Sequence, residues 1–257
     1  MEPNTHQSVR RAAAILRVFT ESTPQLTVSE VARMLGLHKS TVSRILATLA
    51  DEGLVWHDAR TGRYSLGLGL VELAGVALGQ IDVRAAALPH VERLVGSVQE
   101  TVTVSVLRGD EAVTIAHMPS PHSVRHVSWI GRRVPLRSTA AGKVFLAAAL
   151  ASGQEWSALG LPGAANMGDP ASVPEMAAEL RIVHRRGFAT SVDEYESGGA
   201  SIAAPIQDAV QSVVAAVALS GPAERFGADE RLAALPLLTR AASDIAFDLG
   251  ARGEVSA

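Results

Sequence analysis

The sequence contains no cysteine among its 257 residues. This absence excludes a disulfide framework, thiolate metal sites and cysteine nucleophiles. No run approaches the roughly 18–20 consecutive apolar residues that a membrane-spanning helix needs. The opening residues, MEPNTHQSVRRAAAIL, lack the apolar block and small-residue cleavage site of an export signal. We therefore expect the protein to act in the cytoplasm.

Fingerprints of common enzyme sites are also missing. The sequence has no nucleophile elbow, no P-loop and no dinucleotide-binding fingerprint. The segment GLGLVELAG at 67–75 is rich in glycine, but it does not follow the strand pattern of a parallel sheet. We predict no catalytic residues and no cofactor.

Charge is nearly balanced over the whole chain, at a formal −3, but it is distributed unevenly. Residues 1–66 carry eight Lys/Arg against six Asp/Glu, whereas residues 67–257 carry fifteen against twenty. The first segment is therefore mildly basic. This asymmetry is compatible with nucleic-acid binding near the N-terminus, but charge alone does not establish it.

Three helices are predicted in the first segment, over about 8–21, from Thr27 to Gly36, and over about 39–51. Thr27 and Glu30 have the spacing of a capping box, and glycine is the usual residue just after a helix. The third helix has one apolar stripe, formed by Val42, Ile45, Leu46 and Leu49. Its remaining faces are rich in Ser, Thr, Lys and Arg.

The stretch LVWHDARTGRYSL at 54–66 predicts two short strands around a turn at 59–62. Two short helices joined by a tight turn, followed by such a hairpin, indicate a winged helix-turn-helix. The second helix of this motif enters the major groove of DNA. Side chains off its apolar stripe, and two wing arginines, are our candidate DNA contacts: Lys39, Ser40, Thr41, Ser43, Arg44, Thr48, Arg60 and Arg63. The alternative is a merely solvated helix.

The next segment, 67–81, predicts a helix with hardly any polar face. A helix of this kind must bury itself against something. We interpret it as a linker helix that helps the protein to dimerise. Burial in the core of its own chain is the alternative.

The remaining residues, 82–257, mix predicted helices and hairpin strands, which is typical of an α+β domain with a mainly antiparallel sheet. Polar and apolar residues alternate strictly over 101–106, as in a half-buried strand. A third strand is expected over 123–131 and a helix over about 173–186. The last helical segment is expected to be interrupted or kinked near Pro236.

Taken together, these stretches resemble the IclR family of bacterial transcription regulators nearly from end to end. The similarity is carried by SVRRAAAILRVF, LTVSEVARMLGLHKSTVSRILATLADEGLV, YSLGLGLVELA, VPLRSTAAGKVFLA, RRGFATSVDEYESGGASIAAPI and VVAAVALSGPAERF. One departure is His38, where family members often have proline.

The resemblance implies three parts: a winged helix-turn-helix over 1–66, a linker helix over 67–81 and a GAF-like effector-binding domain over 82–257. It further implies a dimer or dimer of dimers on palindromic operator DNA. Binding would be controlled by a small organic effector, with repression as the default and activation as the alternative. An enzyme fused to a DNA-binding domain is a competing class of protein, and so is a DNA-binding protein that senses nothing.

The segment RSTAAGK at 137–143 opens a helix, capped by Ser138 or Thr139, whose free amides favour a carboxylate, aliphatic or aromatic. The resemblance puts the ligand here. It implies ten ligand-binding residues: Trp129, Val134, Thr139, Ala140, Ala141, Ser191, Asp193, Ser201, Ala218 and Ser220. Plainer roles remain open. Thr139 can serve only as a helix cap, the serines can bond to backbone, and Asp193 can belong to a solvated turn.

Three histidines, His117, His122 and His126, lie close together in the sequence. Their spacing matches no metal-ligand motif, and they surround a proline-containing loop. We therefore predict no metal site.

Overall fold

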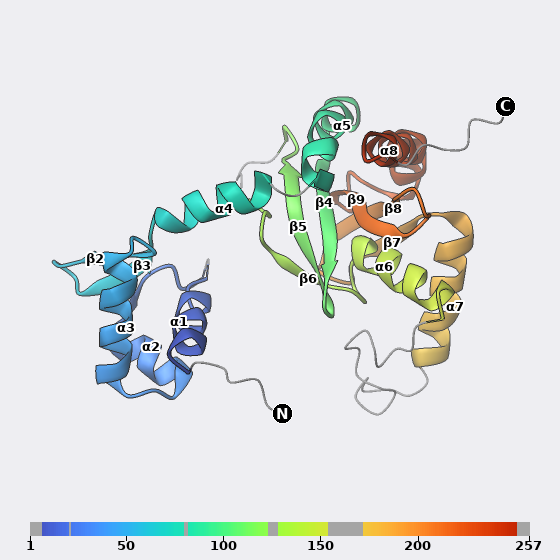
Figure 1. Cartoon of the computed structure of the whole chain (residues 1–257). Coiled ribbons are helices and arrows are strands. Elements are labelled where there is room, and N and C mark those ends of the chain that lie inside the picture. The colour runs from blue at the N-terminus through green and yellow to red at the C-terminus, as the bar shows by residue number, and fades with distance from the viewer. Residues whose placement is uncertain (1–6, 21, 80–81, 123–127, 154–171, 251–257) are drawn as a thin grey trace. The chain divides into compact units, whose positions relative to one another are not determined.

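The computed structural model describes residues 7–20, 22–79, 82–122, 128–153 and 172–250 (Figure 1). The chain divides into two compact units, residues 1–80 and 81–257. The finer division at 66/67 and 81/82 stays a prediction.

The first unit is a winged helix-turn-helix. Its helices are α1 (Gln7–Arg17), α2 (Val28–Leu35) and α3 (Lys39–Asp51). Its strands β1 (Leu26–Thr27), β2 (Val55–Asp58) and β3 (Arg63–Leu66) form an antiparallel sheet in the order β1-β3-β2. The buried core is built around Ile15, Val31, Val42 and Leu46. The predicted bounds of α3 and the predicted wing are thus observed.

The capping box at the start of α2 is confirmed. The amide of Thr27 donates to Glu30 Oε2 at 2.7 Å, and the amide of Glu30 donates to Thr27 Oγ1 at 3.3 Å. The Thr27 amide, together with Thr27 Oγ1, which donates to Glu30 Oε2 at 2.9 Å, lowers the pKa of the Glu30 carboxyl. Gly36 ends the helix with φ of 63°, a left-handed conformation that glycine adopts without strain.

The first helix is shorter than expected, because it ends at Arg17 and not near Glu21. Beyond it the amide of Thr23 donates to the carbonyl of Thr20 at 3.0 Å, and Thr23 Oγ1 donates to the carbonyl of Val18 at 3.1 Å. Threonine side chains that bond locally to the backbone compete with helix formation. These bonds of Thr20 and Thr23 therefore replace a further helical turn.

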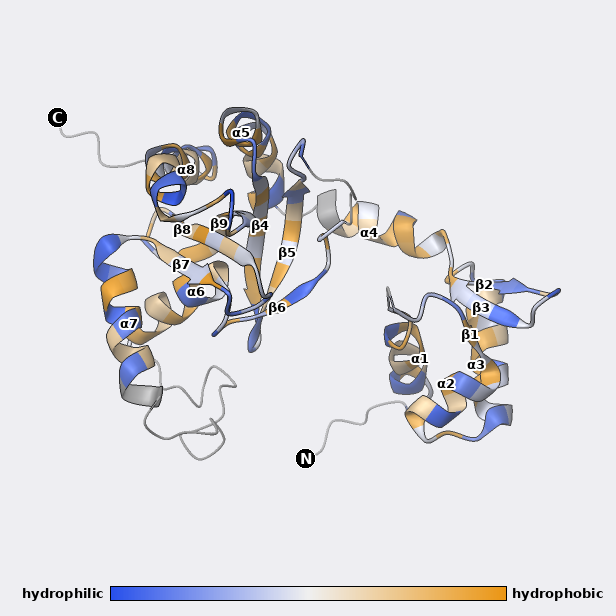
Figure 2. Cartoon of the chain, turned by 180° about the vertical axis from the view of Figure 1, so that it is seen from behind, coloured by the Kyte–Doolittle hydropathy of each residue, from blue (hydrophilic) through white to orange (hydrophobic). Residues whose placement is uncertain are grey.

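The apolar helix α4 (Gly69–Gly79) follows the wing. Figure 2 shows it coloured largely as hydrophobic. Three apolar side chains in α4 and one just before it are 58 to 79 % exposed: Val71, Leu73 and Val76 in the helix, and Leu68 before it. The helix therefore presents a broad apolar surface that its own unit does not cover.

The second unit is built on a six-stranded antiparallel sheet in the order β6-β5-β4-β9-β8-β7. The strands are β4 (Thr101–Arg108), β5 (Glu111–Met118), β6 (Arg133–Pro135), β7 (Ala189–Val192), β8 (Gly199–Gln207) and β9 (Val213–Pro222). The helices are α5 (Asp82–Val98), α6 (Ala140–Ala151), α7 (Ser172–Arg186) and α8 (Ala228–Asp248). Helices α5 and α8 cover one face, while α6 covers the other with α7 packed against it (Figure 1).

Two sequence expectations need correction in this unit. The third strand is not found over 128–131, the described part of the expected range 123–131, and β6 begins only at Arg133. Residues 123–127 lie outside the described residues. The amide of Arg132 instead donates to the carbonyl of Trp129 at 3.0 Å, closing a turn in which Gly131 has φ of 81°. Helix α8 runs unbroken from Ala228 to Asp248 through Pro236, so the expected interruption is wrong and the alternative, a kink, stays a prediction.

The two faces of the sheet have different cores. On the face towards α5 and α8, large side chains such as Val104, Ile202 and Leu219 are fully buried. On the face towards α6 the sheet contributes mostly alanines, among them Ala203 and Ala218. Strand residues alternate between faces, so both cores arise from the same strands. Small side chains let α6 approach the sheet closely.

Candidate functional sites

The outer face of α3 is polar and open to solvent. Its apolar stripe is directed inwards, since Val42, Leu46 and Leu49 are buried. Of the six candidate DNA contacts on this helix, Lys39, Ser40, Ser43, Arg44 and Thr48 are exposed and Thr41 is half-buried. The residue before the helix, His38, makes no side-chain hydrogen bond to it. The structure therefore groups these six residues on or beside one accessible surface.

The two wing arginines differ in their surroundings. Arg60 is exposed in the β2–β3 turn, where Thr61 Oγ1 donates to Asp58 at 2.8 Å and the Arg60 amide donates to it at 2.9 Å. These bonds, that of Thr61 first, lower the pKa of Asp58. Arg63 instead donates to the carbonyl of Gln25 at 3.1 Å and lies 3.4 Å from Glu30 Oε2. Its guanidinium is thus engaged within the fold.

A cavity of about 370 Å³ lies in the second unit, on the α6 face of the sheet. Nine of the ten residues predicted to bind a ligand line it: Trp129, Val134, Thr139, Ala140, Ala141, Ser191, Ser201, Ala218 and Ser220. They come from five different elements and from the segment before β6. The fold therefore brings residues that are distant in sequence around one space.

Asp193 is the exception. It has φ of 58°, its amide donates to the carbonyl of Gly199 at 2.9 Å, and its Oδ1 accepts from the Gly198 amide at 2.6 Å. Asp193 does not line the cavity. The carboxylate shapes the turn between β7 and β8, which is the plainer role left open for it, and a ligand contact stays a prediction.

The start of α6 forms one wall of the cavity. Thr139 is its N-cap: Oγ1 accepts from the Gly142 amide at 3.1 Å and donates to the carbonyl of Pro135 at 2.7 Å. Ala140 and Ala141 follow in the first turn, where amides lack helical acceptors. Gly142 is required for packing, because a Cβ there would lie 2.3 Å from the backbone of Leu136. Thr139 therefore is a cap and also a lining residue.

Several lining residues were not predicted. They include Thr101, Thr103, Ser105 and Thr114 from β4 and β5, and the turn from Tyr195 to Gly199. The alternation TVTVSV at 101–106 carried the signal for β4. A hydroxyl face is expected to meet solvent on a sheet covered on one side, but here it lines a cavity together with the start of α6.

Two aromatic rings meet at this cavity. Trp129 precedes β6 and Tyr195 follows β7, and these strands are the opposite edges of the sheet. Their ring centroids are nevertheless 6.3 Å apart, with the planes tilted by 58°. The sheet must therefore curl strongly towards α6. The Arg132 guanidinium lies over the Trp129 ring, 4.6 Å from its centroid.

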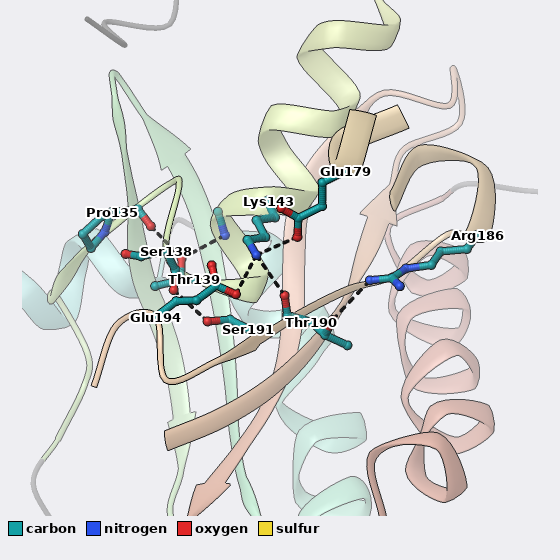
Figure 3. Close-up of polar contacts among 10 residues, drawn as sticks. Pro135, Ser138, Thr139, Lys143, Glu179, Arg186, Thr190, Ser191 and Glu194 are labelled. Carbon is teal, nitrogen blue, oxygen red and sulfur yellow. Dashed lines mark hydrogen bonds and ion pairs between the residues drawn. The ribbon is translucent and has the colours of Figure 1, made fainter. Parts of the chain in front are cut away.

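A buried lysine supports the same region (Figure 3). Lys143 on α6 is only 2 % exposed, and its Nζ lies 2.7 Å from both Glu179 on α7 and Glu194 in the β7–β8 turn. It also donates to the carbonyl of Thr190 at 3.3 Å. Beside it, Ser191 Oγ donates to the carbonyl of Ser138 at 2.8 Å. One ammonium thus ties three elements together behind the cavity.

The histidines do not form a metal site in the described part of the chain. No group of three or more His, Asp or Glu side chains there is arranged to hold a metal ion. His126 lies outside the described residues. The same described residues contain no helix with the length and hydrophobicity to span a membrane.

Comparison with known families matches both units. The IclR helix-turn-helix domain matches residues 8–59, and the family described as bacterial transcriptional regulator IclR C-terminal matches residues 75–247. The glycerol operon regulatory protein of Streptomyces coelicolor is 37 % identical over 250 residues, covering 95 % of this chain and 97 % of that protein.

Two further relatives span the chain. The HTH-type transcriptional repressor AllR of Escherichia coli is 31 % identical over 251 residues, covering 97 % of this chain and 92 % of that protein. A crystal structure of an IclR homologue from Microbacterium hydrocarbonoxydans, complexed with 4-hydroxybenzoate, is 25 % identical with a TM-score of 0.78. It covers 95 % of this chain and 100 % of its own.

Proposed function

The chain belongs to the IclR family of bacterial transcriptional regulators, and we propose that a small organic acid in the cavity of its second unit controls how tightly its first unit binds operator DNA. One observation carries this proposal: nine residues that the sequence singles out for ligand binding surround a single cavity at the start of α6. The resemblance to the family implies a ligand at this helix start, and the cavity there supports that placement.

A carboxylate suits this cavity for an electrostatic reason. The amides of the first turn of α6 point out of the helix, and the helix dipole adds partial positive charge there. Among the described lining residues the charged side chain is Glu196, which is exposed in the turn after β7. Anion binding would therefore depend on backbone amides and hydroxyl groups, without a lysine or arginine in the lining.

The operator-binding surface is proposed to be the exposed face of α3, with Arg60 at the flanking phosphates. In a helix-turn-helix dimer the two reading helices lie about 34 Å apart, one turn of DNA, or a multiple of it. The exposed apolar surface of α4 supports self-association as a dimer or dimer of dimers. Light scattering tests this, because a monomer at micromolar concentration would contradict it.

The proposed control is a coupling between the two units. An effector that favours one arrangement of the sensory units changes operator affinity tenfold with only about 1.4 kcal/mol of coupling. We propose release of repression by ligand, in line with the repressor named among the relatives. Activation is the alternative. We also propose that the protein acts in the cytoplasm and has no catalytic activity.

Arg44→Ala tests the DNA surface. We expect operator affinity to fall by about 1–3 kcal/mol if Arg44 reads a base, or the salt dependence to become shallower by about one unit if it contacts a phosphate. The matched control is Arg17→Ala, which removes an exposed arginine from α1. Gel-shift titrations at several salt concentrations measure both quantities. Unchanged affinity and slope for Arg44→Ala would show that another face of the unit binds DNA.

Ser201→Leu tests the effector cavity. Leucine at this lining position would fill part of the space, so an acid that stabilises the wild type should no longer do so. A ligand present at 100 times its dissociation constant adds about 2.7 kcal/mol to the stability of the folded state. Thermal unfolding with and without ligand measures this gain. An equal gain in Ser201→Leu would move the effector site elsewhere, whereas operator binding without ligand is expected to persist.

A further inference from the structure

A row of hydroxyl groups crosses the floor of the cavity. Ser191 on β7 pairs with Ser201 on β8, Ser201 pairs with Ser220 on β9, and Ser220 pairs with Thr101 on β4. All four line the cavity. Adjacent strands are about 4.8 Å apart, so hydroxyl groups recur at roughly that spacing across four strands. A fifth hydroxyl group, that of Thr103, lies two residues after Thr101 on β4 and also lines the cavity.

These hydroxyls differ in what they already bond. Ser191 uses its proton to donate to the carbonyl of Ser138, and Thr101 accepts from the amide of Ser120 at 3.1 Å. Thr103, Ser201 and Ser220 make no side-chain hydrogen bond to any residue in the described part of the chain. Each of these three can still both donate and accept. The sheet surface that lines the cavity therefore offers three free hydroxyl groups, two of them neighbours in the row and the third nearby on β4.

Full exposure to solvent does not explain these hydroxyl groups, because Ser191 is buried and the other four residues are half-buried. Folding does not require them either. The neighbouring residues on the other face, Val102, Ile202 and Leu219, are fully buried against α5 and α8. On the cavity face, α6 covers the alanines next to the row. An apolar floor would be compatible with the same fold. What the hydroxyl row adds is a polar surface inside the cavity.

From this row we infer that the effector is a small polyhydroxylated aliphatic acid, whose own hydroxyl groups bond to those of Thr103, Ser201 and Ser220. The inference rests on the proposed function, because it takes the cavity as the effector site. A hydroxyl donates and accepts, as the floor does, so a chain carrying several hydroxyls can satisfy several floor positions together. The cavity volume is at the low end of the range for ligand pockets, roughly 300–1,000 Å³, which favours a small molecule.

An unsubstituted hydrocarbon chain or ring fits this floor poorly. It would displace water from Ser201 and Ser220 without replacing the hydrogen bonds, and polar groups left unpaired in this way reduce affinity. Sites built to bond a ligand hydroxyl reject analogues that lack it, sometimes strongly. The start of α6 would bind the carboxylate of either class of acid equally well. The hydroxyl row favours acids that carry hydroxyl groups over those with an unsubstituted chain or ring.

The first experiment compares six-carbon acids of equal charge. Calorimetric titration of the full-length protein with hexanoate, 2-hydroxyhexanoate and gluconate should give affinities that rise in this order, with benzoate as weak as hexanoate. Each added bond is expected to contribute about two- to tenfold. Hexanoate or benzoate binding as tightly as gluconate would overturn the inference. So would the absence of binding by gluconate and its four- and five-carbon homologues.

The second experiment tests whether the order of affinities depends on the hydroxyl side chains that line the cavity. Ser220→Ala and Thr103→Val should each weaken gluconate binding by about two- to tenfold and should not weaken benzoate binding, which gains when an unpaired hydroxyl is removed. Ser243→Ala is the control, because that hydroxyl donates to the carbonyl of Thr239 on α8, away from the cavity. If the two cavity variants weaken gluconate and benzoate by the same factor, the row acts through cavity shape and the inference fails.

The outcomes separate this inference from the proposed function. If benzoate binds more tightly than gluconate and alters operator binding, the proposed control by an organic acid is supported, but the inference that the acid is polyhydroxylated is wrong. Sorbitol has the hydroxyl groups but no carboxylate. If it binds as tightly as gluconate, the pairing of hydroxyl groups is supported, and the claim that the effector must be an acid is wrong. If none of these compounds binds, both are rejected for small acids.

Discussion

On β4, β8 and β9, residues that face α5 and α8 alternate with smaller ones that face α6. Ile202 is fully buried on one face, while its neighbours Ser201 and Ala203 are directed to the other. The first face has the large, interlocking side chains of an ordinary core. The second combines alanines beneath α6 with hydroxyls where α6 begins. Among the residues that the structure describes, the cavity lies on the second face.

The difference teaches how one sheet can serve both stability and binding. Apolar surface removed from water is the main favourable contribution to folding, and the α5/α8 face provides much of it in this unit. The α6 face can then use small side chains, which leave space for a ligand. Substitutions on neighbouring residues of one strand should therefore have separable effects on unfolding and on ligand binding.

The largest expected effect is on the packed face. Ile202→Ala removes a fully buried side chain and should lower the free energy of unfolding by about 2–5 kcal/mol. The matched control, Ser201→Ala, removes a hydroxyl that has no side-chain partner among the described residues and should cost less than about 1 kcal/mol. Urea unfolding of the second unit measures both. Equal losses would erase the distinction between the faces.

Local sequence signals predicted the first unit well. The bounds of α3 follow from its apolar stripe, and the start and end of α2 follow from the Thr27–Glu30 box and Gly36. These features depend on residues within one or two helical turns. Where the prediction failed locally, at the end of α1, Thr20 and Thr23 formed bonds that helix propensity does not include.

The candidate site was less accessible to sequence reasoning because its bonds are non-local. Lys143 is the one charged residue of the segment TAAGKVFLAAALA, a visible signal, but its partners lie 36 and 51 residues away. Arg63 bonds to a carbonyl 38 residues away, which the sequence of the wing alone could not reveal. The polar face of β4 became a lining surface only because the fold brings it to the same cavity as the start of α6.

A smaller effect is expected from the ion cluster behind the cavity. Lys143→Met leaves Glu179 and Glu194 without their cation, and removing one partner of a buried pair can cost about 3–5 kcal/mol. Here the glutamates are 40 % and 37 % exposed and can regain water, so we expect about 1–3 kcal/mol in urea unfolding. No loss at all would mean that the cluster is energetically neutral.

The two glutamates provide a matched pair that sharpens the comparison. Glu194 adjoins Tyr195, a lining residue, whereas Glu179 lies on α7 away from the cavity. Glu194→Gln should therefore weaken effector binding and change Trp129 fluorescence in a Trp56→Phe, Trp156→Phe background. Glu179→Gln should affect stability alone. Identical ligand affinities in both variants would assign the cluster to folding and not to the cavity wall.

The smallest expected effect compares two hydroxyls on the cavity face itself. Thr139 caps α6 and has two protein partners, whereas the Ser201 hydroxyl has none among the described residues. Thr139→Ala should cost about 1 kcal/mol, the usual loss for an N-cap, and Thr139→Ser should cost less because the capping oxygen remains. Urea unfolding would detect the difference. If Thr139→Ala is no more destabilising than Ser201→Ala, the contribution of a hydroxyl group to stability on this face does not depend on its protein partners. The hydroxyl groups there could then not be divided into those that stabilise the fold and those that bind ligand.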